Sequence, residues 1–104
     1  MLEKITELAE KQKKISDFHL RSESDIAYRL LGDIIVAPDS KISEKDLEDL
    51  LKKNCSESDI KKFNSHWELD TAVMLGSLRF RANFFKTLNG SGAVLRRVET
   101  KVPL

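Results

Sequence analysis

The stretch that decides the fold of this chain runs from Leu78 to Val98, with the sequence LRFRANFFKTLNGSGAVLRRV. In its first half apolar residues alternate with polar ones, and the apolar positions are Leu78, Phe80, Ala82 and Phe84. This period of two is typical of a strand with one buried face. The centre, Asn89-Gly90-Ser91-Gly92, tolerates positive φ angles, and Ala93 to Val98 is again rich in strand-forming residues. The stretch therefore predicts a β-hairpin.

Each predicted strand of this hairpin carries two arginines: Arg79 and Arg81 on the first, Arg96 and Arg97 on the second. Because a short loop makes the two strands antiparallel neighbours, we expect these four side chains to gather at one end of the sheet. A guanidinium group matches phosphate oxygens with a rigid fork of donors. The simpler interpretation from composition is an exposed basic edge whose arginines pair with Glu68, Asp70 or Glu99.

The length and composition allow one domain with a modest core, since the chain has 104 residues of which 40% are apolar. Its 18 basic and 17 acidic residues leave a net charge of +1. Such a balance argues against a general binder of nucleic acid, because those proteins usually carry a basic excess.

The single cysteine, Cys55, has no partner for an internal disulfide, and no spacing of Cys or His matches a metal site. The first residues lack the apolar run of a signal peptide, and no later segment reaches the roughly 18 apolar residues of a membrane-spanning helix. These features predict a cytoplasmic protein without a bound metal.

The N-terminal part of the chain predicts one helix and three strands. Residues 2–14 place apolar side chains at helical spacing among Glu and Lys. The segment 15–21 alternates with a period of two and predicts a strand. Residues 26–36 are mostly apolar, with several β-branched side chains, and Gly32-Asp33 interrupts them, which predicts two short strands joined by a turn. Pro38-Asp39-Ser40 should end this block.

Two helices are predicted next, and each has its own start. Ser43-x-x-Asp46 and Ser56-x-x-Asp59 have the spacing of an N-cap with an acidic partner at the third helical position. The apolar stripe of the first helix is Leu47, Leu50 and Leu51, and that of the second is Ile60, Phe63 and Trp67. Residues 68–75 return to strand-forming composition, and Gly76-Ser77 should turn the chain into the hairpin.

The order of these elements predicts an α+β fold. Strands joined by short turns are antiparallel neighbours, so we expect one mostly antiparallel twisted sheet with the helices packed on one face. Residues 1–104 form a single domain in this interpretation. The last residues, Lys101-Val102-Pro103-Leu104, are mostly apolar and close no element, so we expect a domain cut from a longer protein.

Gly90 and Gly92 suggest a nucleotide-binding loop, which would need further residues. A phosphate loop requires Gly-x-x-x-x-Gly-Lys-Ser/Thr before a helix, and a dinucleotide fingerprint requires a third glycine at the helix start. Neither pattern is present in the sequence. We therefore expect these glycines to serve only the turn.

Histidines and acids offer weaker candidates for chemistry. His19 stands two residues from Asp17 on one face of a predicted strand, where a structural hydrogen bond is a simpler interpretation than acid–base catalysis. We expect His66 to cap a helix end or lie on the surface. Glu68 and Asp70 share a strand face, where they could bind a cation or, more simply, pair with arginine across the sheet.

Five short blocks stand in order along the chain: Ser16–Leu20, Tyr28–Gly32, Glu68–Asp70, Arg79–Phe84 and Gly92–Arg96. Together they resemble the N-terminal domain of the pilus retraction (twitching-motility, PilT-type) ATPases, which belong to a wider group of type IV pilus and type II secretion ATPases. The resemblance covers about residues 1–104, and the order and gaps of the blocks make it specific. Ala82 replaces the valine usual in the family, and Leu69 stands between the two acids of its block.

The resemblance implies a PAS-like domain that precedes a RecA-like ATPase domain in a hexameric motor. It implies ATP and Mg in the full-length parent, whereas this chain alone would hold no cofactor and no metal and would not be an enzyme. The implied partners are its own motor domain, neighbouring subunits and the pilus or secretion machinery at the inner membrane, with no nucleic acid and no small-molecule substrate. Pilus extension or type II secretion is the alternative to pilus retraction.

The resemblance also implies a role for Arg81 and Arg96. They stand where the N-terminal domain of the family contributes arginines to the nucleotide bound on the motor domain. Two guanidinium groups on adjacent strands can neutralise the charge that builds on phosphate oxygens. Arg79 and Arg97 are expected to be supporting or surface residues.

Two other functions are open at this point. A PAS-type sensory or ligand-binding module would enclose a small molecule between the sheet and the helices. A single-stranded nucleic-acid binder would stack bases on Phe80, Phe84 or Phe85 beside the arginines. Phe80 and Phe84, however, share the apolar parity expected of the core.

Overall fold

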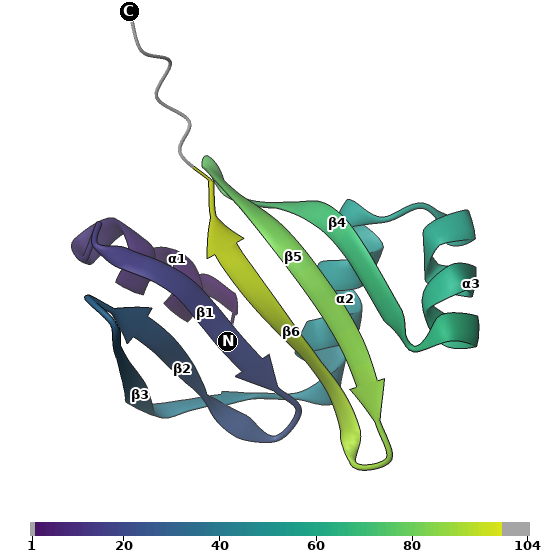
Figure 1. Ribbon diagram of the computed structural model, residues 1–104, viewed down its shortest axis with the longest axis horizontal. Coiled ribbons are helices and arrows are strands. Elements are labelled where there is room, and N and C mark those ends of the chain that lie inside the picture. The colour runs from purple at the N-terminus through teal and green to yellow at the C-terminus, as the bar shows by residue number, and fades with distance from the viewer. Residues whose placement is uncertain (1, 99–104) are drawn as a thin grey trace, which may run out of the picture.

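The computed structural model describes residues 2–98, which form a single six-stranded sheet and three helices (Figure 1). In chain order the elements are α1 (Leu2–Lys11), β1 (Ile15–Arg21), β2 (Ser24–Leu30), β3 (Asp33–Ile42), α2 (Glu44–Asn54), α3 (Glu57–His66), β4 (Glu68–Leu75), β5 (Leu78–Thr87) and β6 (Gly90–Arg97). The strand order is β3-β2-β1-β6-β5-β4, and every pair of neighbours is antiparallel. The predicted α+β class with an antiparallel sheet is confirmed.

The core lies between the sheet and the helices. Of the predicted apolar positions of β5, Phe80, Ala82 and Phe84 are buried and Leu78 is partly buried. The ring of Phe80 meets that of Phe18 edge-on at 6.0 Å between centroids. From the helices, Ile5, Leu50 and Phe63 join the same cluster of buried side chains. Figure 1 shows α1 and α2 behind the strands and α3 beside β4, so no helix of residues 2–98 lies in front of the sheet, on its opposite face. Side chains on that opposite face are therefore open to a ligand or a partner.

Both predicted helix starts are confirmed as capping boxes. The hydroxyl of Ser43 accepts from the backbone N–H of Asp46 at 3.0 Å, and that of Ser56 accepts from the N–H of Asp59 at 3.2 Å. The prediction of Trp67 in the buried stripe of α3 is wrong. Trp67 has a positive φ of 62° and ends the helix, so its side chain leaves the stripe and is 46% exposed.

The strands of the first half extend further than predicted. Pro38-Asp39-Ser40 does not end the block, because β3 continues to Ile42. β3 is an edge strand, and Pro38 lies where its pairing with β2 is irregular, between the pairs Ala27–Val36 and Asp25–Lys41. Proline is tolerated at such positions because no regular ladder hydrogen bond is lost there. The buried hydroxyl of Ser40 donates to the carbonyl of Ala37 at 2.6 Å and accepts from the N–H of Ile26 at 2.9 Å, which satisfies the backbone where the register of β2 and β3 shifts.

The turn of the β5–β6 hairpin lies earlier than predicted. Thr87 pairs with Gly90, so the loop is Leu88-Asn89 and both glycines belong to β6. The expectation that the glycines serve only the turn is wrong for Gly92. A Cβ atom there would lie 2.5 Å from the ring of Phe85 and 2.8 Å from the backbone oxygen of Leu20. Gly92 is therefore required by the close approach of neighbouring strands.

Helix α1 ends at Lys11, three residues before the predicted end. Among the described residues no helix is long and apolar enough to cross a membrane. Two sequence expectations fall outside the described residues: the pairing of Glu99 with arginine and the end of the chain at 101–104.

Candidate functional site

The open face of the sheet carries a row of charged side chains. Directly opposed residues of antiparallel strands point to the same face. Following the pairing from β2 to β5, this row is Arg29, Asp17, Arg96 and Arg81, and the uncharged Ala72 of β4 lies opposite Arg81. The tertiary structure therefore places Arg81 and Arg96 side by side, as the predicted hairpin required.

Arg81 and Arg96 place two positive charges directly opposite each other. Both side chains are exposed, and within residues 2–98 neither forms an ion pair with a carboxylate. Like charges directly opposite each other on a sheet are destabilising. An anion lying between the two guanidinium groups would remove this repulsion, and phosphate oxygens suit their planar donors.

A surface hollow of about 560 Å³ adjoins the two arginines, and its lining includes Asp70, Thr71, Asn83 and Val94. The side-chain amide of Asn83 donates to Asp70 Oδ1 at 2.9 Å and to Glu68 Oε1 at 3.2 Å. The lining of the hollow thus combines the two arginines with the carboxylate of Asp70, the amide of Asn83 and the hydroxyl of Thr71.

The expected pairing of Glu68 and Asp70 with arginine is wrong within the described residues, because both carboxylates accept from the side-chain amide of Asn83 instead. The register explains this difference. Asp70 lies opposite Asn83, whereas Arg81 lies opposite Ala72. No group of three or more potential metal ligands occurs within residues 2–98.

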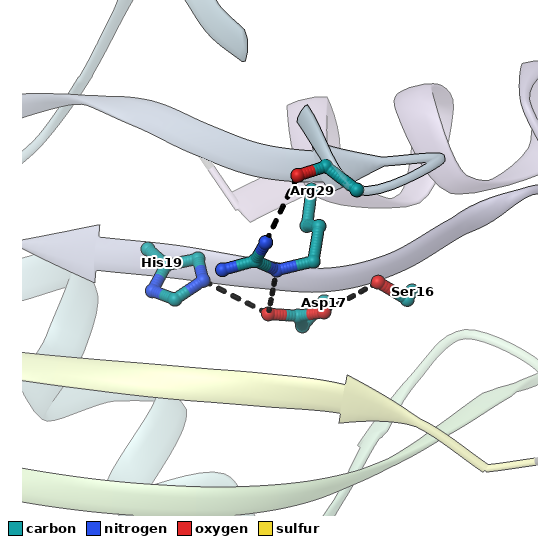
Figure 2. A network of polar contacts seen from close by, with 5 residues as sticks. Ser16, Asp17, His19 and Arg29 are labelled. Carbon is teal, nitrogen blue, oxygen red and sulfur yellow. Dashed lines mark hydrogen bonds and ion pairs between the residues drawn. The ribbon is translucent and has the colours of Figure 1, made fainter. Parts of the chain in front are cut away.

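A second polar network is centred on Asp17 (Figure 2). Asp17 Oδ2 lies 2.9 Å from His19 Nε2 and 3.7 Å from Arg29 Nε, and its Oδ1 accepts from the hydroxyl of Ser16. Arg29 also donates to the carbonyl of Gly32 at 3.1 Å. The expected Asp–His pair is confirmed. Arg29 was missed, because only the alignment of β1 with β2 shows that it lies opposite Asp17.

This network holds Asp17 as an anion. Burial alone would raise the pKa of the Asp17 carboxyl, but the hydrogen bonds from Ser16 and His19 and the charges of His19 and Arg29 outweigh it and hold the pKa below its ordinary value. Ser16 and His19 both contact the carboxylate itself, so the three side chains do not form the nucleophile–base–acid chain of a catalytic triad. A structural hydrogen bond is therefore the better account of His19.

The four arginines of the hairpin do not gather in one place. Arg79 is exposed and lies opposite Met74 on the open face. Arg97 lies opposite Phe80 and so points to the face covered by helices. There its guanidinium group donates to the carbonyl oxygens of Ala9 at 2.8 Å, Lys13 at 3.1 Å and Gln12 at 3.4 Å.

Arg97, expected to be a supporting or surface residue, is a half-buried residue of the covered face. Neighbours along a strand point to opposite faces, so Arg96 and Arg97 cannot both belong to the open face. Arg97 instead satisfies carbonyl groups at the C-terminal end of α1, where a cation is favoured. His66 is exposed, as expected, with Nδ1 3.0 Å from the carbonyl oxygen of Lys62.

No protein-family model matches this sequence, and no curated protein matches it. The fold, however, is one found within solved ATPases, and the predicted resemblance to the N-terminal domain of the PilT-type group is confirmed. The chain is similar to the pilus retraction motor PilT, solved with bound ADP, with 28% sequence identity, a TM-score of 0.79 and coverage of 99% of this chain and 30% of that one.

Two structures of the ATPase DotB show the same fold at lower identity. The protein from Legionella pneumophila is 20% identical with a TM-score of 0.78, and the match covers 98% of this chain and 29% of that one. The protein from Yersinia pseudotuberculosis is 15% identical with a TM-score of 0.69, and the match covers 94% of this chain and 29% of that one. The chain thus spans about 30% of the length of the solved structures it matches.

Proposed function

We propose that this chain is the PAS-like N-terminal domain of a hexameric pilus retraction ATPase, and that Arg81 and Arg96 contact the phosphates of a nucleotide bound on a motor domain. The observation that carries the proposal is the pair of exposed, directly opposed guanidinium groups on the open face of the sheet. The similarity to a retraction motor solved with ADP supports the class of ligand.

In this proposal the two arginines act on charge that develops during phosphoryl transfer. The transferred phosphoryl group spreads negative charge over its oxygens, and positioned guanidinium groups stabilise that charge without chemical change of their own. ATP and Mg are held by the RecA-like domain of the parent. This chain supplies two donors and, by its rigid sheet, the spacing between them.

The same proposal assigns the partners of the domain. Its open face meets nucleotide on the motor domain of its own or a neighbouring subunit, and the assembly works in the cytoplasm at the inner-membrane base of the pilus. The covered face is occupied by the core, so the open face is the surface available for such a contact.

The test is steady-state ATP hydrolysis by the full-length parent with single substitutions. Arg81→Ala or Arg96→Ala should lower kcat by about 10- to 1,000-fold while changing nucleotide affinity much less. Lysine at either position should recover little of the lost kcat, because it keeps the positive charge but lacks the planar fork of donors of a guanidinium group.

The matched control is Arg21→Ala, an exposed arginine of β1 that lies opposite Gly92 rather than in the row of the pair. It should leave kcat unchanged. Melting temperatures of all variants should stay close to that of the wild type, since the three side chains are exposed. Wild-type turnover in both Arg81→Ala and Arg96→Ala would refute the proposal.

A further inference from the structure

Asp17 occupies a special place in the charged row of the open face. It lies directly opposite Arg29 on one neighbouring strand and directly opposite Arg96 on the other. Its side chain is only 14% exposed, whereas Arg81 and Arg96 are exposed. A partly buried carboxylate thus lies beside the arginine pair without belonging to it.

The carboxylate of Asp17 contacts groups other than Arg81 and Arg96. Within the described residues Asp17 is bound by Ser16, by His19 Nε2 at 2.9 Å and by Arg29 Nε at 3.7 Å, and Arg96 is not among its ion-pair partners within 4.0 Å. Figure 2 shows the three groups around the carboxylate. Asp17 is therefore held in place and does not close onto Arg96 as a salt bridge.

We propose that Asp17 is a fixed counter-charge that limits the affinity of the Arg81–Arg96 pair for phosphoryl oxygens. The negative charge of Asp17 repels an anion bound at the arginine pair. Its contacts with Ser16, His19 and Arg29 keep the carboxylate from forming a salt bridge with Arg96. The pair then binds phosphate transiently, as a motor that releases its product in every cycle needs. This inference rests on the anion-binding role given to the arginine pair under the proposed function.

The size of the effect follows from electrostatics. A unit charge one strand away from a multiply charged anion at a solvated surface changes its binding constant by about three- to tenfold. The effect has a definite sign, because removing Asp17 removes repulsion. A merely structural role of Asp17 predicts no tighter binding.

The experiment uses residues 1–104 and inorganic tripolyphosphate as the probe. Binding is followed by NMR through the Nε–H signals of the arginines and the amides of β5 and β6 at about 0.1 M salt, where the Debye length is about 10 Å. Asp17→Asn should bind tripolyphosphate about three- to tenfold more tightly than the wild type. Arg96→Ala should weaken the binding in either background.

Asp33→Asn is the matched control for net charge. Asp33 begins β3, three strands from β6 in the sheet, and strands are spaced by about 4.8 Å, so its charge is screened at the arginine pair. The affinity of the Asp33→Asn protein for tripolyphosphate should equal that of the wild type. Asp17→Ser repeats the measurement with different packing in case Asp17→Asn does not fold, as judged by its melting temperature.

Equal or weaker binding by the folded Asp17 variants would overturn the inference, and so would the absence of measurable binding by both wild type and variants. Tighter binding by Asp33→Asn to the same degree would also overturn it, since net charge alone would then explain the effect. Failure of the proposed function looks different: Arg81→Ala and Arg96→Ala would then bind tripolyphosphate as the wild type does.

Discussion

Arg96 and Arg97 are neighbours in the sequence, yet the pleat of β6 gives them unrelated tasks. Arg96 lies on the open face beside Arg81, and Arg97 lies on the covered face opposite Phe80. Arg96 is exposed, whereas Arg97 donates hydrogen bonds to the carbonyl groups at the end of α1. At the scale of single residues, the direction of a side chain decides its role more than its type does.

Arg97→Ala should lower the free energy of unfolding by about 1–2 kcal/mol, because three carbonyl oxygens near the end of α1 lose a charged donor. Arg97→Lys should recover part of the loss, since it keeps the charge but reaches fewer carbonyls. Urea unfolding of the three proteins measures the difference.

Arg79→Ala is the matched control, because Arg79 is exposed on the open face. Its effect should stay within about 0.5 kcal/mol. If Arg97→Ala were as silent as Arg79→Ala, the contacts with α1 would contribute nothing to stability.

At the scale of elements, the start of α2 is tied to the tip of the β5–β6 hairpin. Glu44, in the first turn of α2, accepts from the backbone N–H of Ser91 at 3.0 Å. Burial alone would raise the pKa of Glu44, but hydrogen bonds from Ser91 and Ser22 and the charge of Lys86 outweigh it and hold the pKa below its ordinary value. This carboxylate joins α2 to β6 and to Ser22 in the turn between β1 and β2, which lie far apart in the sequence.

The lowered pKa predicts a pH dependence of stability. A carboxyl whose pKa is lower in the folded state stabilises the fold above its unfolded pKa, and that contribution is lost as the pH falls through the folded pKa. The wild type should therefore exceed Glu44→Gln in free energy of unfolding at pH 6–8 by a constant amount. The difference should shrink as the pH falls below 4.5, the ordinary pKa of the group.

Urea titrations from about pH 3 to pH 8 measure this difference. Glu48→Gln, an exposed position of the same helix, is the control and should change the stability little at any pH. A Glu44→Gln protein as stable as the wild type at pH 7 would show that the contact with Ser91 needs no charge.

In the whole molecule the two faces of the sheet differ in their surroundings. One face is buried under helices and holds the core, and the other is open and carries the charged row. Such a division lets substitutions on the open face change binding without changing the fold. The sequence has no Gly-x-x-x-x-Gly-Lys-Ser/Thr pattern, so we expect the open face to present arginines without a phosphate loop beside them.

Residues 1–104 alone should therefore show no ATP hydrolysis and only weak affinity for ATP, since the sequence has no phosphate-loop pattern to hold phosphates and metal. Calorimetric titration with ATP, with and without magnesium, and a phosphate-release assay measure this. Tight, magnesium-dependent binding of ATP by this chain would contradict the prediction and would reopen the assignment of the domain.

Sequence alone determined the features that depend on neighbours a few residues apart. The alternation of β5, the capping boxes at Ser43 and Ser56, and the hairpin that brings Arg81 to Arg96 were all predicted from local pattern. The interactions that produce these features act within about four residues or across one short turn, so a short window of sequence is enough to predict them.

Only the tertiary structure decided the rest. The tethering of Asp17 by Arg29, the need for glycine at position 92, the passage of β3 through Pro38 and the capping of α1 by Arg97 were not predicted. Each depends on which strands lie side by side, in which register and at which edge. That arrangement is set by burying one common core from elements up to 88 residues apart, as in the contact of Arg97 with Ala9, and no local pattern encodes it.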